Sequence, residues 1–291
     1  MLFLFLTFLF PYGVKCWPSF SIKDSYDHDV ALIYYNPDDF TNLRCTGLLI
    51  APNVILTAAH CFLNNNDYDT GEYIDPIDVK VYLGLPTVNS QYLKTTKQNV
   101  RNVVIHEKYH STYSEFDIGV IILQNNIPDF CNKQHYKLPT SLFFDKNDGT
   151  SSPEIVISYK NCYFMGWGSP NESIENKRLN KKVIEKLTAD HNAHSLKADS
   201  QIMLTSPISN SNNAPCNGDS GGPIICKDFS NGTEINFVVG VISETSSYAS
   251  SNASAKEFCD KTDLMLGSST ALHKSWINEK IEFYNNGQVC S

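Results

Sequence analysis

About twelve short apolar runs, rich in β-branched residues and separated by clusters of Asn, Ser, Gly and Pro, dominate this sequence of 291 residues. Runs of this length and composition are typical of β-strands. In one of them Val79, Val81 and Leu83 alternate with Lys80 and Tyr82, which is the period of a strand with one buried face. Six runs lie in the first half of the chain, at 30–35, 47–50, 54–57, 79–83, 100–105 and 118–123. Six more lie in the second half, at 154–159, 162–167, 182–187, 201–204, 223–226 and 237–242.

Two sets of six strands predict two all-β barrels, joined through the polar connection at 125–148. The end of the chain differs, because Leu272, Trp276, Ile277, Ile281 and Tyr284 follow a helical stripe. We therefore expect a terminal helix that packs on the second barrel. The expected units are an N-terminal barrel at about 28–125, a C-terminal barrel at about 149–270 and a helix at about 271–285.

Composition limits the function classes. Hydrophobic residues make up 42% of the chain, which is ample for a buried core. The 23 Lys and Arg against 31 Asp and Glu give a net charge of −8, and these charges are interspersed along the chain. Because no basic tract is present to neutralise phosphates, we expect no nucleic-acid partner.

The first ten residues, MLFLFLTFLF, are nearly all apolar but about half as long as a membrane-spanning helix. We interpret residues 1–16 as a signal peptide, although its charged start is missing, and residues 17–291 as the mature secreted domain. A buried N-terminal strand is the alternative. The signal-peptide interpretation predicts an extracellular location and no membrane attachment after cleavage.

Cysteine usage agrees with secretion. Removing Cys16 with the signal peptide leaves eight of the nine cysteines, an even number that suits four disulfides in an oxidising compartment. A zinc site is the competing use, but the chain has no Cys-x-x-Cys pair. Three Asn-x-Ser/Thr sequons are predicted glycosylation sites, at Asn171, Asn231 and Asn252.

Three segments carry residues suited to catalysis. His60 follows an apolar strand in Thr57-Ala58-Ala59-His60-Cys61, and Asp117 precedes the apolar run Ile118-Gly119-Val120-Ile121. Each of these two residues, taken alone, has an ordinary structural explanation. Ser220 differs, because it lies in Gly218-Asp219-Ser220-Gly221-Gly222-Pro223, where glycines leave the backbone open to an approaching carbonyl group.

In this order, the segments TAAHC, DIGVI and GDSGGP resemble the signatures of the chymotrypsin-like (trypsin family) serine peptidases, with similarity from about residue 30 to residue 281. The resemblance implies two six-stranded antiparallel Greek-key barrels with a C-terminal helix. It also implies Ser220 as nucleophile, His60 as general base and Asp117 as the carboxylate that orients the imidazole. The backbone N–H groups of Gly218 and Ser220 would form the oxyanion hole, and the Ser243 hydroxyl would bind Asp117.

The same resemblance implies three disulfides, Cys45–Cys61, Cys162–Cys226 and Cys216–Cys259. Cys131 and Cys290 remain and are paired by elimination, with Cys16 as a competitor.

A rival interpretation is the nucleophile elbow of α/β-hydrolases, because Gly218 to Gly222 also satisfies Gly-x-Ser-x-Gly. That elbow needs a helix directly after Ser220, whereas two glycines, Pro223 and an apolar run follow here. We therefore prefer the peptidase interpretation.

The sequence departs from the family pattern at its activation site. Family enzymes bury a freshly cut Ile-Val-Gly-Gly terminus against the Asp that precedes the nucleophile, which is Asp219 here, yet no such start occurs near residues 15–20. Three explanations remain open: signal cleavage supplies the ammonium, Asp219 is satisfied otherwise, or the oxyanion hole stays unformed.

The specificity pocket departs as well. Ala214 occupies the matching pocket floor, and Ser243-Glu244-Thr245 replaces the usual Ser-Trp-Gly wall. These residues predict cleavage after small or medium uncharged side chains, with Glu244 attracting a basic group at a neighbouring subsite. Asp263 remains an alternative that would restore selectivity for basic residues.

We expect no cofactor and no metal, since the acidic loop at 64–75 lacks calcium-loop spacing. The expected partners are peptide or protein substrates and protein protease inhibitors, and we expect a monomer. The alternative is a protease-like binding or decoy protein that retains the fold but is catalytically weak.

Overall fold

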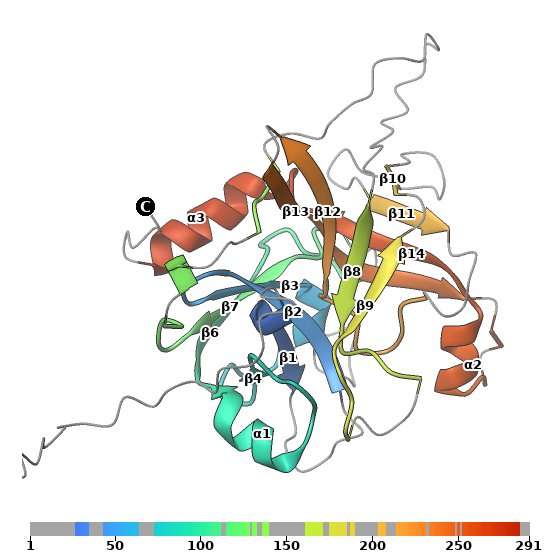
Figure 1. Ribbon diagram of the computed structural model, residues 1–291, viewed down its shortest axis with the longest axis horizontal. Coiled ribbons are helices and arrows are strands. Elements are labelled where there is room, and N and C mark those ends of the chain that lie inside the picture. The colour runs from blue at the N-terminus through green and yellow to red at the C-terminus, as the bar shows by residue number, and fades with distance from the viewer. Residues whose placement is uncertain are drawn as a thin grey trace, which may run out of the picture.

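The computed structural model describes residues 27–34, 43–63, 73–111, 115–128, 130–132, 136–139, 161–170, 175–184, 187–189, 203–207, 214–230, 233–247, 249–250 and 252–285. The expected signal peptide, the strand expected at 154–159 and the sequons at Asn171 and Asn231 lie outside these ranges. Two antiparallel β-sheets and a C-terminal helix form the described fold, which confirms the expected all-β class (Figure 1).

The first sheet has the strand order β5-β4-β1-β2-β3-β7-β6. Its strands are β1 (Val30–Tyr34), β2 (Leu43–Ala51), β3 (Val54–Thr57), β4 (Lys80–Tyr82), β5 (Lys97–Gln98), β6 (Val100–Ile105) and β7 (Gly119–Leu123). β5 and β6 lie at opposite edges, yet only Asn99 separates them in the sequence. One segment therefore joins the two edges and closes the sheet as a six-stranded barrel. β4 lies beside β1, next to the consecutive strands β1, β2 and β3, which is the Greek-key order.

The second sheet has the strand order β10-β11-β14-β13-β12-β8-β9. Its strands are β8 (Cys162–Gly166), β9 (Asn180–Ile184), β10 (Thr188–Ala189), β11 (Met203–Pro207), β12 (Pro223–Ser230), β13 (Thr233–Ser247) and β14 (Thr262–Ser269). The edge strands β9 and β10 are again close in sequence, three residues apart. β14 was not expected, because its sequence contains no Val or Ile and so has little intrinsic preference for a strand. Its hydrogen-bonded pairing with β11 and β13 makes it a strand nevertheless.

Short helices connect these strands. They are α1 (Ser90–Thr96), α2 (Ala255–Asp260) and the 3-10 turns η1 (Asp27–Asp29), η2 (Ala59–Phe62) and η3 (Phe130–Asn132). Sequence analysis did not predict α1 or α2, but α2 carries a recognisable start signal. Ser254 Oγ accepts a hydrogen bond of 3.2 Å from the backbone N–H of Glu257, so Ser-x-x-Glu marks its N-terminus.

The terminal helix, α3 (Lys274–Tyr284), exists as predicted, and Trp276 and Ile277 are buried. The expectation that it packs on the second barrel is wrong, because its polar contacts go to the first. Trp276 Nε1 donates to Glu107 Oε2 at 2.8 Å, and Asn102 Nδ2 donates to the hydroxyl of Tyr284 at 3.1 Å. α3 therefore leaves the second sheet after β14 and lies on the β7 side of the first (Figure 1). A helical apolar stripe shows that one face is buried but not which element covers it.

The two sheets share one apolar core. Leu56 and Ile121 of the first sheet belong to the same buried cluster as Met165, Ile225 and Val241 of the second. A smaller cluster lies within the second sheet, around Phe164, Ile224, Ile242 and Met265. Apolar packing is therefore continuous between the two sheets.

Three disulfides occur among the described residues, and they are the three pairs that the resemblance implies: Cys45–Cys61, Cys162–Cys226 and Cys216–Cys259. Cys131 also takes part in a disulfide. Its pairing with Cys290 stays a prediction, since Cys290 lies outside the described residues. Within the described part of the chain, no helix has the length and apolar character needed to cross a membrane.

Candidate active site

His60 lies in η2, directly after β3, and its position is fixed by one carboxylate. His60 Nδ1 is 2.8 Å from Asp117 Oδ2, and the backbone N–H of His60 donates to Asp117 Oδ1 at 2.8 Å. These two contacts orient both the ring and the backbone of His60. Its side chain keeps 29% of its surface exposed, so the far edge of the imidazole is accessible.

Asp117 is buried two residues before β7, with 1% of its side chain exposed. Its Oδ2 also accepts a short hydrogen bond from Ser243 Oγ, and its backbone carbonyl accepts one of 2.9 Å from Ser268 Oγ. A buried carboxylate is costly unless it is paired and hydrogen-bonded, and here both oxygens are occupied. The second sheet therefore holds the carboxylate that orients a histidine of the first.

A β-bulge explains how Ser243 reaches Asp117. Along the pairing of β13 with β14, Ile242 lies opposite Gly267 and Glu244 lies opposite Leu266, so Ser243 has no cross-strand partner. A bulge of this kind re-aims the side chain of the extra residue. The Ser243 hydroxyl thereby turns toward Asp117.

Electrostatics keep Asp117 ionised. Burial raises the pKa of Asp117, but the charge of His60, the hydrogen bonds from His60 and Ser243 and the backbone N–H of His60 outweigh burial and hold that pKa below its usual value. Burial lowers the pKa of His60, but the charge and hydrogen bond of Asp117 and the charge of Glu244 outweigh burial and raise that pKa above its usual value. The pair therefore stabilises a proton on the imidazole.

The segment around Ser220 is a tight turn stabilised by its own backbone. The N–H of Asp219 donates to Cys216 O at 2.9 Å, and the N–H of Gly222 donates to Asp219 O at 2.9 Å. Gly218 and Gly221 have φ values of 96° and 78°, which side chains rarely adopt. This conformation explains the glycines on either side of Ser220.

The turn that carries Ser220 is hydrogen-bonded to β2 of the first barrel and packs against the end of β3, which leads to His60. The backbone N–H of Thr46 donates to Ser220 O at 2.8 Å, and Thr46 Oγ1 donates to Gly218 O at 2.8 Å. A Cβ atom on Gly221 would lie 3.1 Å from the backbone nitrogen of Ala58 and would overlap Thr57 Oγ1. Because Ala58 is two residues before His60, the turn that carries Ser220 lies against the histidine loop.

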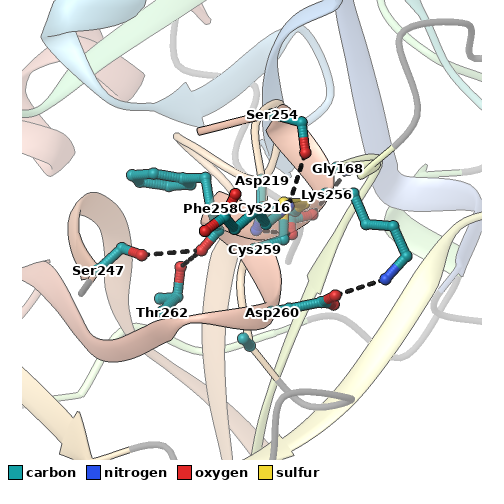
Figure 2. Close-up of a disulfide and its surroundings, with 12 residues drawn as sticks. Gly168, Cys216, Asp219, Ser247, Ser254, Lys256, Phe258, Cys259, Asp260 and Thr262 are labelled. Carbon is teal, nitrogen blue, oxygen red and sulfur yellow. Dashed lines mark hydrogen bonds and ion pairs between the residues drawn. A yellow bond between two sulfur atoms is a disulfide. The ribbon is translucent and has the colours of Figure 1, made fainter. Parts of the chain in front are cut away.

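Asp219, next to Ser220, is fully buried. Its Oδ1 accepts from the N–H of Gly168 at 2.7 Å, and its Oδ2 accepts from the N–H of Cys216 at 2.8 Å. Figure 2 shows Asp219 beside the Cys216–Cys259 disulfide, which joins this turn to α2. Gly168 must be glycine, because a Cβ there would overlap the Asp219 carboxylate.

The residues expected around a substrate pocket are placed by β13 and the segment before the turn. Ala214 and Ser243 are buried, Thr245 is partly buried and Glu244 is exposed. Thr245 pairs with Met265 of β14, which is buried. The side chain of Asp263 is outside the described part of the chain, as are the sequons named above, whereas Asn252 is described and exposed.

His60 also lies beside the Cys45–Cys61 disulfide, with a ring nitrogen and the two sulfur atoms within 4.8 Å of one another. A metal site of this kind would use thiolates, but these sulfur atoms are bonded to each other. His60 Nδ1 is bound to Asp117 in addition.

Sequence analysis missed several residues that build the site. Ser268 lies in β14, a strand that was not predicted, and Thr46 lies next to Cys45 with no motif around it. Gly168 follows Met165-Gly166-Trp167, and only its contact with Asp219 distinguishes it from other glycines. These residues act through contacts more than 50 positions apart in the sequence.

The chain is similar in sequence to known proteins. A family model described as Trypsin matches residues 21–259 of the chain. Chymotrypsin of Phaedon cochleariae is 28% identical over 218 residues, which covers 74% of this chain and 67% of that protein. Coagulation factor XI of Bos taurus is 27% identical over 205 residues (68% and 29%), and serine protease 28 of Mus musculus is 27% identical over 199 residues (62% and 63%). The chain thus spans less than two thirds of the length of these last two relatives.

Proposed function

Because this chain belongs to the trypsin family of serine peptidases, we propose that it is a secreted serine endopeptidase that cleaves peptide bonds through an acyl-enzyme on Ser220. The observation that carries the proposal is the position of Asp117, whose carboxylate binds both the ring and the backbone of His60. Its disulfides support a secreted protein, since such bonds persist in oxidising compartments.

In this proposal Ser220 Oγ attacks the carbonyl carbon of the scissile bond while His60 takes the hydroxyl proton. Asp117 holds the imidazole with its Nδ1 protonated and stabilises the imidazolium that forms. His60 then gives the proton to the leaving amine, which departs and leaves the acyl-enzyme. His60 then takes a proton from water as that water attacks the ester. The bond between the acyl carbon and Ser220 Oγ breaks, and His60 gives the proton to Oγ, which regenerates the hydroxyl.

The negative oxygen of each tetrahedral intermediate would be bound by the backbone N–H groups of Gly218 and Ser220. The positive φ of Gly218 and the bonds from Thr46 to Gly218 and Ser220 support this role, because they fix the peptide planes of the turn. Losing one such donor typically lowers the rate by about 10²–10³.

Specificity in this proposal is for small or medium uncharged side chains. Ala214 offers no charge at the pocket floor, and the branched side chain of Thr245 would narrow the pocket entrance, where the family usually has glycine. The exposed Glu244 would attract a basic group of the substrate at an adjacent subsite.

Hydrolysis of short peptides tests the proposal. The mature chain is expected to cleave a peptide after Ala or Val, and Ser220→Ala is expected to retain the melting temperature while losing at least about 10⁴ in kcat. A folded wild-type chain that cleaves no peptide of a broad panel would instead support the protease-like binding protein.

A further inference from the structure

Asp219 accepts two hydrogen bonds. It takes part in none of the ion pairs found among the described residues. Both bonds come from neutral backbone N–H groups, so they satisfy the oxygens without balancing the charge. Burial raises the pKa of Asp219, as expected for a carboxylate removed from water. A counter-charge near this group would therefore stabilise the turn that carries Ser220.

Lys182 in β9 is placed to supply that charge. Its ammonium donates a short hydrogen bond to the backbone carbonyl of Ala214. Ala214 is two residues from Cys216, whose N–H binds Asp219 Oδ2. The Lys182 side chain is partly buried, with its Nζ 5.7 Å from the centroid of the Phe164 ring. The ammonium is thus fixed on the same segment, 214–216, that holds the Asp219 carboxylate.

The segment that leads into β9, together with the first residue of β9, also lies close to Asp219. Asn180 Nδ2 donates to Gly168 O at 2.9 Å, and the N–H of Gly168 binds Asp219 Oδ1. Lys177, partly buried, is anchored through its carbonyl, which accepts from the N–H of Val88 at 2.8 Å. Segment 177–182 is therefore tied to both sides of the Asp219 carboxylate.

The charges of these two lysines act on Asp219. They oppose the rise that burial causes in the pKa of Asp219, with Lys182 the stronger of the two. Burial lowers the pKa of Lys177, and the Asp219 charge acts against that change. The interaction between the buried Asp219 carboxylate and the partly buried Lys177 ammonium is thus mutual.

We propose that Lys182, assisted by Lys177, is a positioning residue that supplies the counter-charge of Asp219 and so holds the Gly218 and Ser220 amides in their catalytic orientation. This inference rests on the proposed peptidase function. It accounts for the missing Ile-Val-Gly-Gly start, because an internal ammonium takes the role of a newly cut terminus. The mature protein is then active whatever its N-terminal residue.

The test compares four variants with the wild type: Lys182→Met, Lys182→Arg, Lys177→Met and the control Lys181→Met. Lys181 is the exposed neighbour of Lys182. Its Nζ lies 4.1 Å from the centroid of the Tyr163 ring, whereas that of Lys182 lies near Phe164, the other aromatic residue of β8. The readouts are the rate of labelling by a fluorophosphonate probe, kcat and KM for one peptide, and the melting temperature. A fifth protein carries a retained N-terminal extension, so that no free amine lies near residues 15–20.

Lys182→Met is expected to lower kcat and the labelling rate by about 10²-fold with KM nearly unchanged, as for a lost oxyanion-hole donor. Lys182→Arg is expected to restore most of the rate, because it restores the charge. Lys177→Met has a smaller effect in the same direction, while Lys181→Met and the extended protein match the wild type.

Two outcomes would overturn the inference while leaving the peptidase function intact. In one, the extension abolishes labelling and Lys182→Met does not. In the other, Lys182→Met changes only the preference for acidic side chains, which would assign Lys182 to the substrate pocket. A folded wild-type protein that resists the probe would overturn the proposed function as well.

Discussion

The hydroxyl of Ser243 donates to Oδ2 of Asp117, the same carboxylate oxygen that contacts Nδ1 of His60. A residue of the second sheet thus completes the environment of a carboxylate that orients a residue of the first. Since the bulge at Ser243 exists only through the pairing of β13 with β14, strand register and imidazole orientation are linked.

Ser243→Ala tests this link. Removing the hydroxyl takes away one hydrogen bond to a buried charge, an interaction typically worth about 1.5–3 kcal/mol, so kcat/KM is expected to fall about 10- to 100-fold. Ser247→Ala is the matched control, because Ser247 lies in the same strand but donates to Phe258 O instead. Equal activity of both variants would show that the Ser243 bond does not matter for catalysis.

The pH profile tests the charges around His60. Catalysis needs neutral His60, so activity is lost as the pH falls through its pKa, which Asp117 and Glu244 raise above the usual value for histidine. The negative charge of Glu244 raises that pKa, so Glu244→Gln is expected to move the acid limb of kcat/KM to lower pH. Glu282→Gln, at an exposed position of α3, is expected to leave the limb in place. An acid limb that moves to higher pH in Glu244→Gln would contradict this account.

Gly221→Ala tests the fastening of the nucleophile turn. The new Cβ would overlap Thr57 Oγ1 and the Thr46 carbonyl at a φ of 78°, so we expect a loss of about 2–5 kcal/mol in the free energy of unfolding. Gly84→Ala, with a φ of 68°, measures the backbone strain alone and is expected to cost less. Urea unfolding followed by tryptophan fluorescence gives both values, and a tolerated Gly221→Ala would refute the tight contact between turn and histidine loop.

Thr245→Gly tests the pocket wall. The wild type is expected to prefer Ala or Val over Phe and Arg, and the variant to gain about tenfold in kcat/KM for a larger apolar side chain, as is usual for one or two carbon atoms of pocket space. Fast wild-type cleavage after Arg would contradict the proposed preference and favour a role for Asp263.

Local patterns predicted most of the strands and the terminal helix, because β-branched runs and a helical stripe depend on residues close in sequence. The resemblance identified the main catalytic residues but not the residues that hold them, so Ser268 and Gly168 were missed. Their roles come from contacts with Asp117 and Asp219. β14 lacks a local strand signal, and the destination of α3 depends on Glu107 and Asn102 far away in the sequence. Tertiary contacts, rather than propensity, decide these features.

Mass spectrometry of the fluorophosphonate-treated protein tests the central claim most directly. The account predicts one covalent adduct, on the peptide that contains Ser220, and its absence from Ser220→Ala and, at short times, from His60→Ala. A folded wild-type protein with no adduct, or with an adduct on another serine, would contradict it.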